Sequence, residues 1–255
     1  MTAIGQSEPR TLVIVPALNE EEALPATLKE VRTAVPYADI VVVDDGSRDA
    51  TARVAREGGA VAVVLPYNLG VGGAVRTGLR YASQHEYDRA VVVDADGQHD
   101  PSGITALLDA LARADLVIGS RFADGAPVYD VGRVRRRAMR LLQRIVRVLT
   151  GQRFTDVTSG FRALDRPVIE LLARDYPAEY LADTVEALLI VNHAGFRVTE
   201  VPIAMRVRAG GVPSSRGLGL VVNYLRVLIG ILSSGSRRDR KPPVRASEPP
   251  MEESS

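Results

Sequence analysis

Two pairs of carboxylates in the N-terminal half of the chain follow short, mainly apolar runs. Asp94 and Asp96 come directly after residues 89–93, and Asp44 and Asp45 come directly after residues 40–43. Both runs are apolar enough to form buried strands. In an open α/β sheet, ligands bind at the edge formed by the carboxyl ends of the strands. The repeated arrangement therefore predicts a ligand site at that edge.

The spacing of Asp94 and Asp96 predicts a metal site. Alternate residues at a strand end project to the same side, and two neighbouring carboxylates repel one another unless a cation lies between or beyond them. Their hard oxygen atoms suit Mg²⁺ or Mn²⁺, which in turn bind phosphate oxygens. The alternative is a solvated acidic turn, because Asp-Gly-Gln favours turns. The second acidic turn, at Asp44, favours the metal and a phosphorylated ligand.

The segments after the first two strands have a structural and a functional interpretation. Asn19 after the first strand, and Ser47 or Asp49 after the second, are suited to cap the helices that follow. Capping does not require the adjacent pair Asp44-Asp45. A carboxylate at a strand end can also accept hydrogen bonds from a ribose hydroxyl or a base N–H, so we expect a nucleotide there.

Strand and helix patterns alternate over the first half of the chain. This alternation predicts an α/β fold, with a mostly parallel sheet and helices on both of its faces. Strands are predicted over residues 11–15, 39–43, 60–65, 89–93 and 115–119, and helices over residues 20–35, 49–57, 70–85 and 101–113.

The second half is more irregular. Helices are predicted over residues 132–150, 183–193 and 218–232, a polar segment over 156–166, and short strands over 197–201 and 203–207. Residues from 233 onward show no periodicity and predict a disordered tail. We therefore expect an N-terminal arm (1–10), one domain (11–232) and a tail (233–255). Within the domain we expect a nucleotide-binding half (11–122) and an acceptor- and membrane-facing half (123–232).

The composition is typical of one globular domain with a substantial core. Of the 255 residues, 46% are hydrophobic and 25% charged, and the net charge is +1. The chain has no cysteine, which excludes disulfides and thiolate metal sites. Residues 1–10 lack the apolar segment of a signal peptide, and residues 218–232 are too few to span a bilayer. The low aromatic content and the lack of a base-stacking motif argue against nucleic-acid binding.

Six motifs, in order along the chain, carry a family resemblance. Pro16–Glu20, Asp44–Ser47 and Asp94–His99 resemble the Pro-x-x-Asn-Glu, Asp-Asp-Gly-Ser and Asp-x-Asp-x-Gln-His motifs of the inverting GT-A glycosyltransferases of family 2. Three more resemble the dolichyl-phosphate mannose/glucose synthase branch, the polyprenyl-phosphate sugar synthases: Gly119–Phe122, Ser159–Arg162 and Glu200–Ile203. The resemblance extends from about residue 11 to about residue 232, and the ordered set is more specific than any one motif.

The resemblance implies a nucleotide pocket at the first two motifs. Pro16, Leu18 and Glu20 would line this pocket. Asp45, together with Asp44, would bind the base or the ribose of the nucleotide sugar.

It also implies a metal and phosphate site at the later motifs. Asp94, Asp96 and Gln98 would hold Mg²⁺ or Mn²⁺ on the diphosphate, with Asp96 nearest the sugar and Ala95 against the donor. Arg121 would neutralise a donor or acceptor phosphate.

Arg208 would close over the phosphates from a mobile C-terminal loop. The chain departs from the family pattern nearby: Pro213-Ser214-Ser215 stands where Ser-Lys commonly follows a glycine. Either a cationic phosphate contact is missing, or Arg216 replaces it.

The need for a catalytic base depends on the acceptor. A phosphate monoester is already an anion near neutral pH, whereas a sugar hydroxyl requires a base, commonly a carboxylate. Asp156, Asp183 and Glu186 are candidates, and we count Asp156 with Asp96 and Arg121 among the expected catalytic residues. Asp183 and Glu186 fit a capped helix start equally well.

The helix predicted over residues 132–150 is basic and amphipathic. One stripe consists of Arg133, Arg137, Arg140, Arg144 and Arg147, and a parallel apolar stripe consists of Val134, Ala138, Leu141, Ile145 and Val148. This pattern suits an anionic membrane surface, and the alternative is an ordinary surface helix packed on the core. Residues 218–232 would form a second interfacial element or a contact with a partner, such as a membrane protein.

Together these features predict an inverting, metal-dependent glycosyltransferase at the cytoplasmic face of the membrane. It would move a sugar from a UDP- or GDP-sugar to a polyprenyl phosphate. The alternative acceptor is a saccharide or a soluble molecule, as in cell-wall or polysaccharide assembly. A homo-oligomer is compatible with the sequence. A nucleotidyltransferase would require a basic Gly-rich loop where Pro16–Asn19 stands, and a non-catalytic binding scaffold would tolerate the loss of Asp96.

Overall fold

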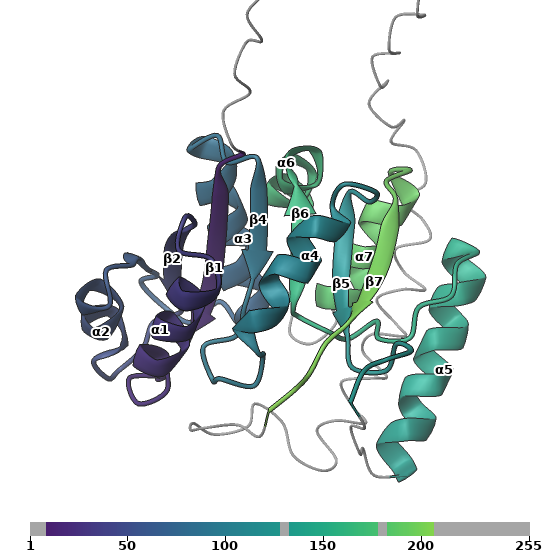
Figure 1. The fold of residues 1–255 in the computed structure, drawn as a ribbon, viewed down its shortest axis with the longest axis horizontal. Coiled ribbons are helices and arrows are strands. Elements are labelled where there is room, and N and C mark those ends of the chain that lie inside the picture. The colour runs from purple at the N-terminus through teal and green to yellow at the C-terminus, as the bar shows by residue number, and fades with distance from the viewer. Residues whose placement is uncertain (1–8, 128–132, 178–182, 207–255) are drawn as a thin grey trace, which may run out of the picture.

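A single seven-stranded sheet organises the computed structural model, which describes residues 9–127, 133–177 and 183–206. The strand order is β3-β2-β1-β4-β6-β5-β7, with β1 and β4 near the middle (Figure 1). The strands are β1 (Thr11–Ala17), β2 (Asp39–Asp44), β3 (Val61–Val64), β4 (Arg89–Val92), β5 (Leu116–Ser120), β6 (Arg162–Asp165) and β7 (Val198–Pro202).

The sheet is mostly parallel, as predicted. Strand β6 is the exception, because it is antiparallel to both β4 and β5. It begins at the edge of the sheet where its parallel neighbours end, and Arg162 is paired with Val92 and with Ile118. The loop that precedes β6 is therefore brought to the carboxyl edge.

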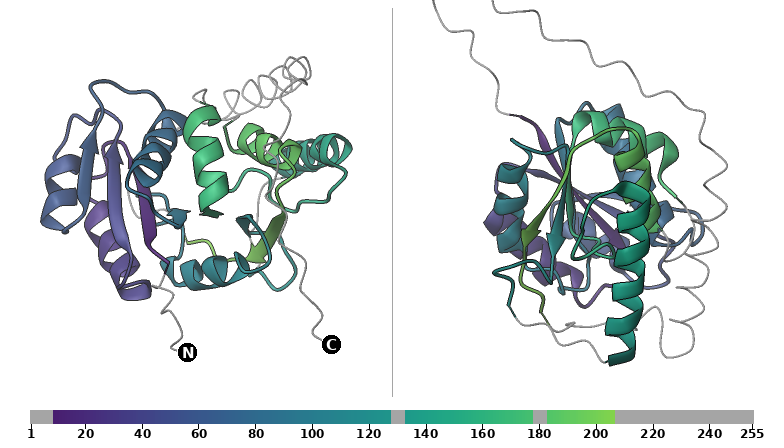
Figure 2. Two further views of the ribbon diagram at one scale, coloured as in Figure 1. Left: turned by 90° about the horizontal axis from the view of Figure 1, so that it is seen from above. Right: turned by 90° about the vertical axis from the view of Figure 1, so that its right-hand side faces the viewer.

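Helices cover both faces of the sheet, which also confirms the predicted fold class (Figure 2). One face carries α1 (Leu24–Ala34), α2 (Thr51–Glu57), a 3₁₀ turn (Pro101–Gly103) and α4 (Ile104–Ala110). The other carries α3 (Val71–Gln84), α5 (Arg133–Thr150), α6 (Arg166–Asp175) and α7 (Asp183–His193).

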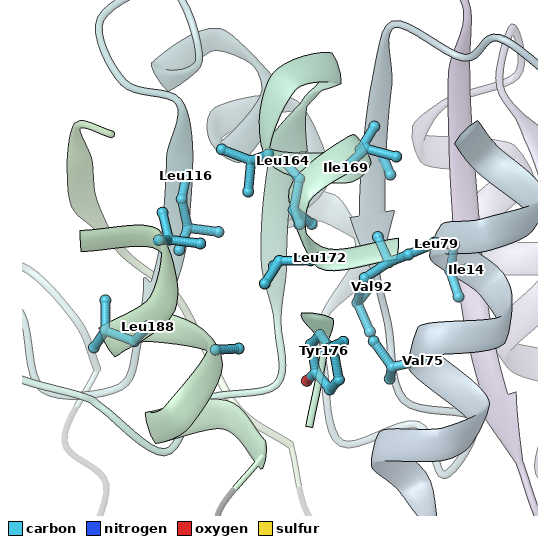
Figure 3. Packing of buried hydrophobic residues seen from close by; sticks show 14 of the residues in the cluster. Ile14, Val75, Leu79, Val92, Leu116, Leu164, Ile169, Leu172, Tyr176 and Leu188 are labelled. Atoms are coloured by element: carbon cyan, nitrogen blue, oxygen red, sulfur yellow. The ribbon is translucent and has the colours of Figure 1, made fainter. Parts of the chain in front are cut away.

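The core consists of two apolar clusters separated by the sheet. Side chains alternate along β1, so that Val13 and Val15 enter the cluster under α1 and α4, whereas Ile14 enters the cluster under α3 and α6. Figure 3 shows this second cluster, in which Ile14, Leu79, Val92 and Leu172 pack between the sheet and its helices. This alternation with period two is expected of strands covered on both faces.

Helix α3 lies unusually close to the sheet at Gly78. A Cβ atom added to Gly78 would lie 2.3 Å from Ile14 Cγ2, a distance that two carbon atoms cannot adopt without displacement. The absence of a side chain at residue 78 thus lets α3 sit directly on β1.

Several predicted elements differ from the structure. The first helix begins at Leu24 rather than at residue 20, and helix α6 was not predicted. The strand predicted over residues 203–207 is wrong for residues 203–206, which form only an isolated bridge between His99 and Met205. Residues 207–255, with the predicted helix 218–232 and tail, lie outside the described residues.

Helix α5 buries residues that lie beside the apolar stripe described from the sequence. Met139, Leu142 and Val146 face the core, whereas Leu141 and Val148 are 52% and 84% exposed. The stripe that packs on the core is therefore shifted by one residue from the apolar stripe described from the sequence.

Within the part of the chain that the structure describes, no helix meets the length and hydropathy needed to cross a bilayer.

Candidate active site

Most of the predicted site residues that the structure describes lie at or just beyond the ends of strands, along one edge of the sheet. Pro16 lies in β1, and its register partner Val43 directly precedes Asp44 in β2. Residues 94–98 follow β4, Arg121 follows β5, and Asp156 lies in the loop before β6. The parallel register of β1 with β2 and with β4 places these strand ends side by side. Arg208 lies outside the described residues.

The loops after β1 and β2 are joined by reciprocal hydrogen bonds. The Asn19 N–H donates to Ser47 Oγ (2.9 Å), and Asn19 Oδ1 accepts from the Arg48 N–H (2.9 Å). Asn19 has φ of 55°, a left-handed conformation that Asn tolerates. Asn19 therefore does not cap a helix, because its side chain binds the neighbouring loop.

A second pair of hydrogen bonds continues this joint. The Glu21 N–H donates to Asp49 Oδ2 (3.2 Å), and Glu21 Oε2 accepts from the Ala50 N–H (2.9 Å). Asp49 also accepts from the Thr51 N–H (3.0 Å), but the N-cap of α2 is Ala50 and no side chain caps this helix, so the predicted cap at Ser47 or Asp49 is wrong. Leu18 is half-buried and Glu20 is buried between these loops and α1.

Asp44 and Asp45 are both buried and both bound to backbone amides. Asp44 Oδ1 accepts from the Ser47 N–H (2.8 Å), and Asp45 Oδ1 accepts from the Leu69 N–H (2.7 Å). Burial raises the pKa of Asp45, while the amides of Leu69 and Gly70 lower it. Asp45 thus ties the loop before α3 to the expected nucleotide pocket.

The loop after β4 holds its two carboxylates differently. Asp96 is 7% exposed, and its Oδ1 accepts from the Gln98 N–H (2.9 Å). The side chain of Asp94 is 37% exposed, and its Oδ2 lies 3.4 Å from His99 Nε2. Because His99 Nδ1 accepts from the Asp94 N–H (3.1 Å), the ring proton faces the Asp94 carboxylate. The buried His99 ring also stacks on Phe161 (4.9 Å between centroids).

This donor set fits a cation that is shared with a substrate. Among the described residues, no three His, Cys, Asp or Glu side chains converge to hold a metal by themselves. Mg²⁺ is usually bound through one or two carboxylates together with substrate phosphates and waters. Asp94 and Asp96 supply two carboxylates, and Asp94 is accessible from solvent. They fit a cation held jointly with a diphosphate.

The segment after β7 returns to this loop. The Arg206 N–H donates to the Gln98 carbonyl (2.9 Å), and the Arg206 guanidinium pairs with Asp100 (2.9 Å) and with Glu30 of α1. The chain that follows β7 is thereby attached to the loop of Asp94 and Asp96.

Arg121 is held in a two-pronged ion pair with Asp156. Its Nε and Nη2 donate to the two carboxylate oxygens at 2.6 and 2.7 Å, and Nη2 also donates to Thr158 Oγ1 (2.9 Å). The Asp156 side chain is fully buried and that of Arg121 is 9% exposed. Both oxygens of Asp156 are therefore committed to a guanidinium.

A second group of buried charges lies behind Asp94. Arg162 is 4% exposed; its Nε donates to the Ser159 carbonyl (2.8 Å), and its Nη1 has no hydrogen-bond partner in the described structure. The pKa of Asp183 is raised overall to about 6. Burial is the largest cause; the negative charge of Asp94 also raises the pKa, whereas the positive charge of Arg162 lowers it. A Cβ added to Gly72 would lie 3.3 Å from Asp183 Oδ2, so this carboxylate lies against the first turn of α3.

Sequence reasoning assigned no role to His99, Arg162 or Glu200, although all three lie in the quoted motifs. Their position in those motifs was the available signal. Their contacts, with Asp94, Ser159 and Thr155 respectively, depend on the folded chain.

Comparison with known proteins is consistent with this geometry. The sequence profile of the family described as Glycosyl transferase family 2 matches residues 12–172. An undecaprenyl-phosphate mannosyltransferase of Micrococcus luteus is 34% identical over 214 residues, which cover 82% of this chain and 88% of that protein. A polyprenol monophosphomannose synthase of Mycolicibacterium smegmatis is 37% identical over 221 residues, with 82% of both chains covered.

Solved structures share the fold. Glucosyl-3-phosphoglycerate synthase from Mycobacterium tuberculosis, in complex with Mn²⁺, uridine diphosphate and glucosyl-3-phosphoglycerate, superposes with a TM-score of 0.68 at 23% identity. The match covers 89% of this chain and 80% of that one. The GT-A fold expected from the motifs is confirmed, and the chain is a glycosyltransferase that belongs to family 2.

Proposed function

We propose that this glycosyltransferase moves a sugar from a UDP- or GDP-sugar to a polyprenyl phosphate, with inversion at the anomeric carbon and with help from Mg²⁺ or Mn²⁺. The observation that carries the acceptor class is the similarity, over 82% of the chain, to two proteins named for polyprenyl-phosphate mannosyl transfer.

The carboxyl edge of the sheet supplies the parts that such a transfer needs. The joined loops after β1 and β2 would hold the nucleotide, with Pro16, Leu18, Glu20, Asp44 and Asp45 as its lining. Asp94 and Asp96, with Gln98, would hold the cation, and Ala95 would lie against the donor. When bound, the cation neutralises the negative charge that develops on the departing nucleoside diphosphate.

Arg121 would bind a phosphate at the same edge. Its guanidinium is oriented by Asp156 and Thr158 before any substrate arrives. A fixed cation stabilises charge in a transition state without first having to reorganise. Arg121 therefore suits either the donor diphosphate or the phosphate of the acceptor.

The burial of two of the three candidate bases favours a phosphate acceptor, whereas the third, Glu186, is half-buried. Asp156 is fully buried with both oxygens bound by Arg121, and Asp183 is 4% exposed. Neither carboxylate is placed to take a proton from an acceptor hydroxyl in solution. A phosphate monoester needs no such base, because it is already an anion near neutral pH.

A peripheral position on the inner face of the membrane would fit this acceptor. Helix α5 carries seven arginines and no acidic residue between residues 133 and 150. Among its described side chains, those of Arg136, Arg137, Arg140, Arg144 and Arg147 are exposed. Such a surface is attracted to anionic headgroups.

A radiolabel transfer assay tests the proposal directly. Purified protein, Mn²⁺ or Mg²⁺ and a short polyprenyl phosphate are incubated with labelled UDP-glucose, GDP-mannose and other donors in parallel. We expect label to enter the organic phase with one donor, and not with the Asp96→Asn variant. Slow donor hydrolysis without organic-phase label would overturn the lipid acceptor and favour a saccharide or soluble acceptor.

A further inference from the structure

Glu200 of β7 makes an unusual number of hydrogen bonds to one short loop. Its carboxylate accepts from the Thr155 N–H (2.7 and 2.9 Å to the two oxygens), from the Thr155 hydroxyl (2.9 Å) and from the Asp156 N–H (2.8 Å). Two consecutive backbone amides and one hydroxyl therefore converge on a single half-buried side chain. A carboxylate can accept all of them, because it has two oxygens and no hydrogen of its own.

The residues that Glu200 holds are those that orient Arg121. Asp156 presents both of its oxygens to the Arg121 side chain, and its Oδ2 also accepts from the Arg121 N–H (3.2 Å). Thr158, two residues further on, accepts from Arg121 Nη2 and donates to Asp156 Oδ1 (3.1 Å). The loop thus surrounds one side of the guanidinium.

The same loop is fixed to the backbone beside Arg121. The hydroxyls of Ser120 and Thr155 lie 2.6 Å apart, and Ser120 Oγ accepts from the Phe122 and Ala123 N–H groups. Gln143 of α5 donates to the Thr155 carbonyl. Thr155 is therefore the point at which β5, β7 and α5 meet.

From these contacts we propose that Glu200 is a positioning residue for Arg121. Glu200 touches no reacting atom. It fixes the backbone of Thr155 and Asp156, and Asp156 in turn fixes the guanidinium at the carboxyl edge of the sheet. The two oxygens of a carboxylate match the fork of an arginine, so a small rotation of Asp156 would break one or both bonds. The proposal rests on the proposed function only in assigning a phosphate to Arg121.

The substitution Glu200→Gln isolates this role. Glutamine has the same shape, but its NH₂ group is a donor and would face at least one of the N–H groups that Glu200 now accepts. The loop must then shift, and Arg121 loses its fixed orientation. Because a displacement of about 1 Å at a reacting centre can lower the rate about 100-fold, we expect kcat to fall by about 10- to 100-fold. Binding of the nucleoside part of the donor should change little, since Glu200 bonds to Thr155 and Asp156 and not to the loops after β1 and β2.

A double-mutant cycle separates positioning from a general loss of structure. If Glu200 acts through Arg121, the variant Glu200→Gln/Arg121→Lys should be no slower than Arg121→Lys alone, because the oriented fork is already absent. Multiplicative losses in the double variant would overturn the proposal. Glu170→Gln is the matched control, since Glu170 is an exposed partner of Arg166 on α6, and it should retain wild-type rates.

A spectroscopic readout keeps the proposal testable apart from activity. In the folded protein, the Arg121 Nε–H signal, assigned by its loss in Arg121→Lys, should be protected from solvent exchange by its bond to Asp156. We expect Glu200→Gln to abolish that protection while the unfolding transition stays cooperative. Retained protection would contradict the positioning role even if the transfer reaction proved to be a different one. Should Glu200→Gln not fold, Glu200→Asp shortens the side chain so that its carboxylate cannot reach both the Thr155 and the Asp156 N–H groups, and unchanged protection together with unchanged kcat in that variant would overturn the proposal.

Discussion

At the scale of residues, most carboxylates of the candidate active site already form hydrogen bonds within the protein. Asp44, Asp45 and Asp96 each accept a hydrogen bond from a backbone N–H group, and Asp156 forms an ion pair with Arg121. Asp94 differs because its side chain is 37% exposed and its carboxylate faces a histidine. The arrangement orients each group before a substrate binds, which is the condition for electrostatic stabilisation of developing charge.

The first prediction concerns the two carboxylates after β4. Asp96→Asn keeps the shape of the side chain and still accepts from Gln98, but it removes one negative charge from the expected cation site. We expect kcat at saturating Mn²⁺ to fall at least about 100-fold, comparable to losing one strong electrostatic contact in a transition state. The measurement is initial-rate transfer across a Mn²⁺ titration, with circular dichroism to establish the fold. Near-wild-type turnover of Asp96→Asn would contradict the metal-dependent mechanism.

A second prediction follows from the buried Asp183, whose pKa is raised to about 6, chiefly by burial. The native state binds this proton more tightly than the unfolded chain does, so the free energy of unfolding should fall as the pH rises from about 4 to about 6. The expected decrease is about 3 kcal/mol at most. Asp183→Asn should lack this decrease. Urea unfolding of both proteins between pH 4 and pH 7.5 measures it, and equal slopes would argue against a raised pKa.

Much of the site was predictable at this scale, because a residue type and its position after a strand are local properties. Asp94, Asp96 and Asp44 follow apolar runs, and parallel strands bring such ends together. The pairing of Asp156 with Arg121 was not predictable, since 35 residues separate them. The same holds for Glu200, which lies 45 residues from Thr155.

At the scale of elements, close packing of α3 on β1 depends on Gly78. We predict that Gly78→Ala destabilises the protein by about 1–3 kcal/mol, because the added methyl overlaps Ile14 Cγ2. Ile14→Ala removes the overlapping atom at the cost of a cavity. In the double variant the two losses should be less than additive, as expected for residues in contact. Denaturant unfolding of the four proteins gives the coupling energy, and strict additivity would contradict the packing argument.

Two elements, β6 and α6, were not predicted from the sequence, and for the same reason. Strand β6 and helix α6 follow one another in a segment with charged residues at Arg162, Asp165 and Arg166, so no apolar run marks the strand. Arg162 is nonetheless buried, and Asp165 caps α6 by accepting from the Val168 N–H (3.2 Å). Tertiary burial of an arginine is not visible in hydrophobic periodicity.

At the scale of the whole molecule, one sheet unites the expected donor and acceptor halves. Strand β6 from the second half lies between β4 and β5 from the first, and β7 extends the sheet beyond β5. Helix α5 lies at the β7 end, next to α7, at the opposite end of the sheet from α2 (Figures 1 and 2). The molecule therefore presents its basic helix away from the loops after β1 and β2, which are expected to bind the nucleotide.

A prediction at this scale concerns docking to membranes. Arg140→Glu/Arg144→Glu should weaken binding to vesicles that contain anionic lipid at least about 10-fold, because each basic residue near such a surface contributes about 1 kcal/mol. Transfer to long-chain acceptor in vesicles should fall with it, while transfer to a short acceptor in detergent should stay near wild type. Sedimentation with vesicles measures the binding. Arg53→Glu/Arg56→Glu on α2 is the control, and an equal loss in that variant would contradict a specific role for α5.

The reciprocal bonds between the loops after β1 and β2 also bear on how these loops can be exchanged between family members. Asn19 and Glu21 are matched to Ser47, Arg48, Asp49 and Ala50 by hydrogen bonds in both directions. A chimera that imports one loop from another family member without the other would break these matches. Such grafts should therefore exchange residues 18–22 and 45–51 together, because hydrogen bonds in both directions make the two segments one structural unit.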